Sequence, residues 1–291
     1  MSSKESKRQE KMMSQLFRGK EILKPLDTGW IDNFVGCIRE FSANIFFYKK
    51  NGNTIMLDAG FNYDRLEEKM KWLGIAPESV SHIFLTHLDE DRIELLEKDS
   101  PVRFPDAKTY LGSLEQQYIA GLIRRKTFSG VIKLPTPELQ KQPYLLKDGD
   151  SVDIGDIHVE AMLVPGHTWG HMVYLVDEKY LFTGDTVWLG PDGGRSYVNV
   201  LAEDNKLAME SLENLKQRLK ERELKPWVIT AHTGWTSDFQ FAFSHIDEVC
   251  NAMKKQKPHD PDAPADPYDE SKDIERKARV DKLPECKKIR S

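Results

Sequence analysis

The chain has 291 residues, of which 39% are hydrophobic and 31% charged, and its formal net charge is −5. This length suits one large domain, and the hydrophobic fraction supplies a sizeable core. The small negative charge does not favour nucleic acid or an anionic membrane as a partner.

The ends and the cysteines indicate a compartment. Residues 1–20 form a polar, mildly basic tail, and no apolar stretch of the signal-peptide type follows it. No run of about 18 apolar residues is present, so no membrane-spanning helix is expected. Cys37, Cys250 and Cys286 lie far apart in no metal-ligand spacing, which suits a reducing environment. We expect a cytoplasmic protein with a small-molecule substrate, and leave open whether it forms a homo-oligomer.

A globular domain is expected over residues 21–256. Apolar, β-branched and aromatic runs predict strands at 43–50, 53–60, 82–86, 158–166, 172–177, 179–185 and 226–234. Asn51-Gly52 between the first two runs is a hairpin signal.

Apolar residues at helical spacing predict helices between the strands. These are expected from an N-cap at Asn62 to Gly74, and at 113–125, 204–222 and 238–255. Two blocks of strands, each followed by helices, predict two sheets packed together with helices outside, an αββα sandwich. Beyond the domain, residues 257–291 have prolines three apart, which suits either an extended tail or a segment that packs on a neighbouring subunit.

Short polar motifs follow several of these strands. They are "NTIMLDAG" with Asp58, "HIFLTHLDEDR" with His87, Asp89 and Asp91, "MLVPGHTWGH" with His167 and His171, "YLFTGDT" with Asp185, and "VITAHTG" with His232. Each motif alone is an ordinary loop or turn. Together they place imidazoles and carboxylates at strand ends, and these are the ligands that zinc and similar divalent ions accept.

Through these motifs, residues 22–255 resemble the metallo-β-lactamase superfamily of metal-dependent hydrolases. "PGHTWGH" followed by "FTGD" is similar in form to the glyoxalase II and lactonase-like branches. The resemblance implies a four-layer αββα sandwich, in which two mixed β-sheets are flanked by helices and the metal site lies at one edge.

The resemblance also implies a ligand set for one or two divalent ions, with zinc first and iron or manganese as alternatives. The first position would use His87, Asp89 and His167, and the second would use Asp91 and His232. Asp185 would bridge the two positions or bind the second alone. A metal-bound hydroxide would be the nucleophile, because a bound divalent ion lowers the pKa of water from about 15.7 toward 7.

Other residues would assist these ligands. Asp91 would orient the attacking water and carry its proton. His171 would support a ligand or donate to an oxyanion, or it is a core histidine. Asp58 and Arg92 would lie behind the ligands.

The first motif departs from the family pattern, His-x-His-x-Asp-His, at two positions. Asp89 replaces the second histidine and offers a harder oxygen ligand. Arg92 replaces the last histidine and cannot bind a metal, because its guanidinium stays protonated. Arg92 either offsets the charge of Asp89 or pairs with Asp91 and withdraws it from the second metal. A two-metal site, a one-metal site and a degenerate site therefore stay open.

Aromatic and basic residues near the motifs suggest a substrate mouth. Trp169, Trp188 and Trp235 lie close to proposed ligands, where they either line an aromatic mouth or belong to the core. Arg195, in a Gly-rich segment, would hold a carboxylate or phosphate, or is a solvated loop residue.

The leading hypothesis is hydrolysis of an acyl bond, such as an ester, thioester, lactone or amide, in a small molecule. The alternatives are a one-iron oxygenase and a degenerate, non-catalytic binding protein. A phosphodiesterase or nuclease is less favoured, because no nucleic-acid-clamping insertion interrupts the motifs.

Overall fold

The computed structural model describes residues 22–62, 64–252 and 254. The predicted polar tail (residues 1–20) and the Pro-rich extension (residues 257–291), which includes Cys286, lie outside these residues. The described thiols, Cys37 and Cys250, are both buried and unpaired.

The first sheet orders its strands β1-β2-β3-β4-β5-β6-β9. Their bounds are Gly29–Trp30, Val35–Glu40, Ala43–Lys50, Asn53–Leu57, Val80–Leu85, Lys108–Gly112 and Tyr144–Leu146. Strands β1 to β4 pair antiparallel, and β4, β5, β6 and β9 pair parallel, so the sheet is mixed. The predicted hairpin at Asn51-Gly52 joins β3 to β4.

The second sheet orders its strands β10-β11-β12-β13-β16-β17. Their bounds are Ser151–Ile154, Ile157–Leu163, Met172–Val176, Tyr180–Phe182, Trp227–Thr230 and Gly234–Thr236. All pairs are antiparallel except β13 with β16, so this sheet is mixed too.

The two sheets pack face to face through aromatic side chains. The ring centroids of Phe46 and Phe182 lie 5.6 Å apart, and those of Phe84 and Tyr174 lie 5.3 Å apart. Each ring pair joins one sheet to the other, and all four rings are buried. This core fixes how the strand ends of the two sheets meet.

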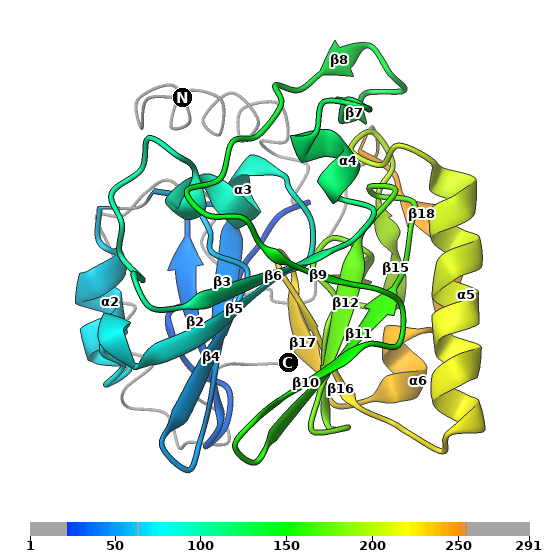
Figure 1. Ribbon diagram of the computed structural model, residues 1–291. Helices are drawn as coiled ribbons and strands as arrows, with labels where there is room; N and C mark the ends of the chain where they lie inside the picture. Colours follow the sequence, from blue (N-terminus) through cyan, green and yellow to red (C-terminus); the bar gives the residue numbers. More distant parts are fainter. Residues whose placement is uncertain (1–21, 63, 253, 255–291) are drawn as a thin grey trace.

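Helices cover the outer faces of both sheets (Figure 1). Helix α2 (Leu66–Trp72) packs on the first sheet, and α5 (Asn205–Glu221) and α6 (Phe239–Ala242) pack on the second. The predicted stripe of Ala208, Leu212, Leu215 and Leu219 on α5 is buried. The predicted αββα sandwich is confirmed.

Shorter elements complete the described chain. They are η1 (Pro77–Ser79), α3 (Glu90–Ile93), η2 (Glu94–Leu96), α4 (Gln116–Ile119), the hairpin β7 (Lys126–Thr127) and β8 (Ile132–Lys133), and the small sheet of β14 (Val187–Gly190), β15 (Gly193–Val198) and β18 (His245–Cys250). Figure 1 shows the β7–β8 hairpin projecting beyond one end of the sandwich. None of the helices described is long and apolar enough to span a bilayer.

One predicted helix is largely wrong, and two others have different bounds from those predicted. Among the described residues of the segment predicted as a helix over 238–255, the only helix is α6, and strand β18 follows it and pairs parallel with β15. Its buried residues, Ile246 and Cys250, are four apart and so fit a helix equally well in sequence. The helix predicted over 113–125 shortens to α4, because Gly121 follows it in a left-handed conformation with φ +68°. Helix α2 begins at Leu66 rather than just after Asn62.

Candidate metal centre

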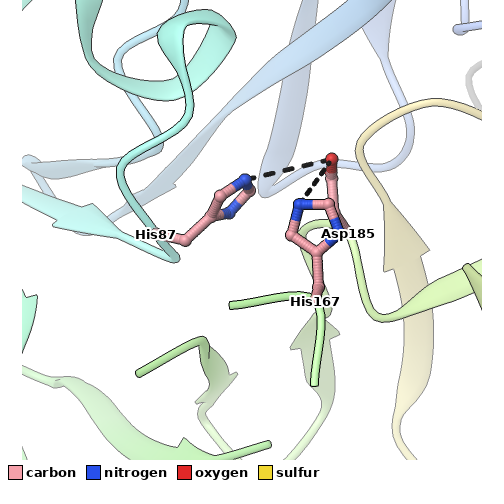
Figure 2. A group of neighbouring side chains, drawn as sticks. All are labelled: His87, His167 and Asp185. Carbon is pink, nitrogen blue, oxygen red and sulfur yellow. Dashed lines mark ion pairs between the residues drawn. The ribbon is translucent and has the colours of Figure 1, made fainter. Parts of the chain in front are cut away.

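The motifs that follow the strands converge at one edge of the sandwich. His87 follows β5 of the first sheet, whereas His167 and Asp185 follow β11 and β13 of the second. Figure 2 shows both imidazoles pointing at one carboxylate oxygen. The Nε2 atoms of His87 and His167 lie 3.9 Å and 3.7 Å from Oδ2 of Asp185. The predicted residues therefore meet across the two sheets.

These three residues form a group whose ligand atoms all lie within 4.8 Å of one another, and all three are buried. Asp89 lies beside them, with Oδ2 3.1 Å from Nε2 of His167 and 3.5 Å from Nε2 of His87. Two imidazoles and two carboxylates thus surround one point, which we call the first position.

The first position fits a divalent ion. Nε2 of His87 is buried and has no hydrogen-bond partner among the described residues. A buried nitrogen without a partner costs free energy unless something binds it. A metal ion coordinated by His87, His167 and Asp185 would satisfy this atom.

Asp58 orients His87 through Thr86. Oδ1 of Asp58 accepts hydrogen bonds from the backbone N of Thr86 at 2.8 Å and from its hydroxyl at 3.0 Å. Because that hydroxyl donates to Asp58, it accepts from Nδ1 of His87, 3.0 Å away. This leaves the lone pair of His87 on Nε2, which faces the first position.

A second group consists of Asp91, Asp185 and His232. Nε2 of His232 lies 3.3 Å from Oδ2 of Asp91 and 3.3 Å from Oδ1 of Asp185. We call the point between these atoms the second position. Arg92 also reaches it: its Nη2 lies 2.6 Å from Asp91 Oδ2, 3.2 Å from Asp185 Oδ1 and 2.6 Å from His232 Nε2. The second position therefore does not fit a metal ion as the first does.

Arg125 is a site residue that the sequence did not reveal. Its Nε and Nη2 donate to the two oxygens of Asp89 at 2.7 Å and 2.8 Å. Burial raises the pKa of Asp89, but Arg125, His87 and His167 together outweigh this effect and hold the pKa well below its ordinary value. Burial and Arg125 also lower the pKa of His167 to about 4, so His167 stays neutral, as a metal ligand must. Arg125 belongs to no motif, and only the tertiary fold brings it here.

His171 supports the site from inside the core. It is fully buried, and its Nε2 accepts a hydrogen bond of 3.2 Å from the backbone N of Asp185. Its ring stacks on that of His87 with centroids 4.7 Å apart. Burial lowers its pKa well below the ordinary value, so the ring is neutral. These contacts favour a supporting histidine over an oxyanion donor, because the ring is buried and does not line the cavity over the site.

Most of the residues suggested to bind substrate lie away from the cavity over the site. Trp188 is 1% exposed and donates from Nε1 to Ile22 O, and Trp235 is buried against Trp227 at 4.6 Å between ring centroids. Arg195 is held by ion pairs with Asp192 and Glu248. These three suggestions are corrected: the tryptophans lack exposed surface, and the carboxylates already neutralise the guanidinium. Trp169 is 45% exposed but does not line the cavity over the site.

A cavity of about 310 Å³ opens over the second position. Its polar lining includes the site residues Asp89, Asp91, Asp185 and His232, and also Ser42, Glu90, Thr127 and Lys133. Its apolar walls come largely from the β7–β8 hairpin and neighbouring loops: Leu23, Phe61, Phe128, Ile132, Leu134, Pro135 and Leu201. Tyr197 also lines it. The site is thus reached through a pocket with carboxylates at one end and apolar side chains around it.

Comparison with known proteins identifies the family of the chain. The family model described as the metallo-beta-lactamase superfamily matches residues 38–224. The chain belongs to the metallo-β-lactamase superfamily. The family predicted from the motifs is thus confirmed.

Two curated relatives carry hydrolase names. The probable metallo-hydrolase YqgX of Bacillus subtilis is 27% identical over 155 residues, which cover 52% of this chain and 69% of YqgX. The probable polyketide biosynthesis zinc-dependent hydrolase BaeB of Bacillus velezensis is 28% identical over 136 residues, which cover 47% of this chain and 50% of BaeB. The chain thus spans about half the length of BaeB. Both names agree with the predicted class of metallo-hydrolase.

Solved structures of the superfamily share the fold. A metallo-beta-lactamase from Pontibacter korlensis superimposes with a TM-score of 0.55 at 17% sequence identity, covering 76% of this chain and 96% of that one. At this identity the similarity concerns the fold alone.

Proposed function

We propose that the protein is a metal-dependent hydrolase that cleaves an acyl bond, such as an ester, thioester, lactone or amide, in a small molecule. The observation that carries this proposal is the first position, where His87, His167 and Asp185 converge and His87 Nε2 lacks a partner. A divalent ion bound there, with zinc first, would act as a Lewis acid and lower the pKa of water from about 15.7 toward 7.

Asp91 would handle the proton of the attacking water. Its carboxylate lines the cavity, as does that of Asp185, whereas His87 and His167 do not line it. Burial raises the pKa of Asp91, but Arg92 and His232 together outweigh this effect and keep the pKa below its ordinary value. An ionised carboxylate facing the cavity can orient a water molecule and accept its proton.

Tyr197 would stabilise the substrate's developing oxyanion. It lines the cavity, and its ring stacks on that of His232 with centroids 5.5 Å apart. Burial raises the pKa of Tyr197 well above its ordinary value, so the phenol keeps its proton. A fixed O–H donor beside the reacting carbonyl is what an oxyanion requires.

The cavity walls favour a substrate with an apolar group next to the scissile bond. Phe61, Phe128 and Ile132 offer apolar surface within reach of Asp91. This lining, together with the resemblance of "PGHTWGH" and "FTGD" to glyoxalase II and lactonases, supports an acyl substrate.

The test is a panel of ester, thioester, lactone and amide substrates, assayed with zinc. Replacing Asp91 with asparagine should lower kcat by about 10²–10⁴-fold while metal content is retained. Asp192→Asn, which changes an exposed aspartate paired with Arg195, is the matched control and should leave kcat unchanged. Turnover of none of these bonds, or full activity of Asp91→Asn, would contradict the proposal.

One-iron oxygen chemistry is a second candidate, favoured by the donor set. Two imidazoles and a carboxylate are the ligands of many non-haem iron oxygenases. Metal analysis of protein purified without added metal, together with an oxygen-uptake assay, separates the two candidates. The oxygenase requires bound iron and consumes oxygen, whereas the hydrolase does neither.

A further inference from the structure

The buried guanidinium of Arg92 lies at the second position. Arg92 is fully buried, although arginine is one of the residues least often found in a protein interior. One nitrogen, Nη2, contacts a ligand atom of all three residues of the second group, Asp91, Asp185 and His232. A nitrogen of a positively charged guanidinium thus lies where a second metal ion would lie.

The hydrogen-bond directions agree with this placement. Nδ1 of His232 lies 2.7 Å from Ser42 O, which can only accept, so Nδ1 carries the proton of the neutral ring. In the neutral ring Nε2 then has the free lone pair, and it lies 2.6 Å from Nη2 of Arg92. Each ligand atom that a second ion would need is already within hydrogen-bond distance of this guanidinium.

The distances show that Arg92 and a second metal ion cannot use the same ligand atoms at once. Contacts of 2.6–3.2 Å are hydrogen bonds, whereas zinc binds nitrogen and oxygen at about 2.0–2.2 Å. Because a guanidinium stays protonated, Arg92 cannot become a ligand, and its charge would repel an ion placed beside Nη2.

Arg125 does not fill the first position in the same way. Its Nη2 contacts only one member of the first group, His167, at 3.1 Å, and otherwise serves Asp89 and Leu201 O. His87 Nε2 stays without a partner beside it. The two arginines thus differ: Arg125 borders the first position, and Arg92 occupies the second.

We propose that Arg92 replaces the second metal ion, so that the site binds one divalent ion, held by His87, His167 and Asp185. This inference rests on the metal site of the proposed function. It accounts for Arg92 at the place of a ligand histidine: the guanidinium joins Asp91, Asp185 and His232 as a permanent cation.

The test is the metal stoichiometry of the full chain, loaded with excess zinc, freed of unbound metal and analysed by mass spectrometry. We expect about one equivalent for the parent protein, about two for Arg92→His, and about one for Arg92→Lys, the control that keeps the charge. Cobalt loading gives a second readout: magnetically isolated ions in the parent and a coupled pair in Arg92→His. Circular dichroism establishes that each variant folds.

The outcomes separate the two proposals. Two equivalents in the parent would overturn the replacement by Arg92 and leave a metallo-hydrolase intact. No bound metal in the parent, even in excess zinc, would overturn the metal-dependent function itself. One equivalent in both the parent and a folded Arg92→His would show that the guanidinium is not what excludes the second ion, and would also overturn the inference.

Discussion

At the scale of single residues, the candidate site depends on side chains that never touch a ligand atom of the metal. Asp58 accepts a hydrogen bond from the Thr86 hydroxyl, and this hydroxyl accepts one from Nδ1 of His87. The Asp58 backbone takes a left-handed conformation with φ +58°, which is uncommon for a residue other than glycine. Such a conformation persists where the surrounding contacts stabilise it, and here they aim the carboxylate at Thr86.

Replacing Asp58 with asparagine should weaken zinc binding by about 10–100-fold, the usual effect of losing a partner behind a ligand histidine. The amide can turn its NH₂ group toward the Thr86 hydroxyl, which then donates to Nδ1 of His87 and moves the proton to Nε2. Competition with a chromophoric chelator measures the change in affinity. Unchanged affinity would show that Asp58 has only a folding role.

Glu40 makes stability depend on pH. Burial raises its pKa from 4.5 to about 8, so the folded protein holds a proton there that the unfolded chain releases. The stabilisation is therefore complete below pH 4.5 and is lost as the pH rises toward 8. Glu40→Gln, which stays uncharged, should match the parent near pH 4.5 and exceed its free energy of unfolding near pH 8 by a few kcal/mol, on the order set by the shift.

Urea unfolding at both pH values checks this prediction. Glu78→Gln, which changes an exposed glutamate, is the control and should follow the parent at each pH. If the free energies of unfolding of Glu40→Gln and the parent differed by the same amount at both pH values, the raised pKa of Glu40 would be contradicted.

At the scale of elements, the loop that carries His167 is attached to helix α5. Gly166 has φ +138°, and a Cβ atom there would lie 2.3 Å from Cα of Ala208 on α5. The carbonyl of Gly166 accepts from the backbone N atoms of Glu203 and Asp204 at 3.0 Å and 2.9 Å. The helix therefore packs against the residue next to a candidate ligand, and the glycine of the "PGHT" motif has a packing role.

Gly166→Ala should push α5 away from the loop and destabilise the fold by about 1–3 kcal/mol or more, from backbone strain and overpacking together. Because His167 is the next residue, zinc affinity should fall as well. Gly74→Ala is the matched control: its φ is also positive, +65°, but nothing lies within 4 Å of the added Cβ. Equal losses in the two variants would show that backbone strain alone matters.

At the scale of the whole molecule, the site joins the two sheets. His87 follows the first sheet, and His167 and Asp185 follow strands of the second. An ion held by all three would bind only the folded protein, since unfolding separates its ligands. Metal binding and folding should therefore be linked.

Adding zinc to chelator-treated protein should raise Tm, by the equivalent of about 2.7 kcal/mol at a free zinc concentration of 100 times Kd. Differential scanning fluorimetry at increasing zinc concentrations measures the shift. Asp185→Asn weakens the ligand that lies between His87 and His167, and it should remove most of the dependence of Tm on zinc concentration. If the Tm of the parent did not change with zinc concentration, the result would argue against a metal that bridges the sheets.

The sequence by itself determined the class of fold and the candidate ligands. Strand-ending motifs such as "THLDEDR" and "FTGDT" are local, and strand ends in a sandwich meet at an edge, so His87 and Asp185 were predictable from order and spacing. Hydrophobic periodicity likewise located the stripe of α5, because one face of a long helix must be buried.

Only the tertiary structure decided the contacts of the arginines and the strand at His245–Cys250. The sequence left open whether Arg92 offsets Asp89 or pairs with Asp91, and the fold places its Nη2 among Asp91, Asp185 and His232. Arg125 reaches Asp89 across 36 positions in the chain. Such contacts depend on how distant segments pack, and a long flexible side chain carries no periodic signal of where its charge will lie.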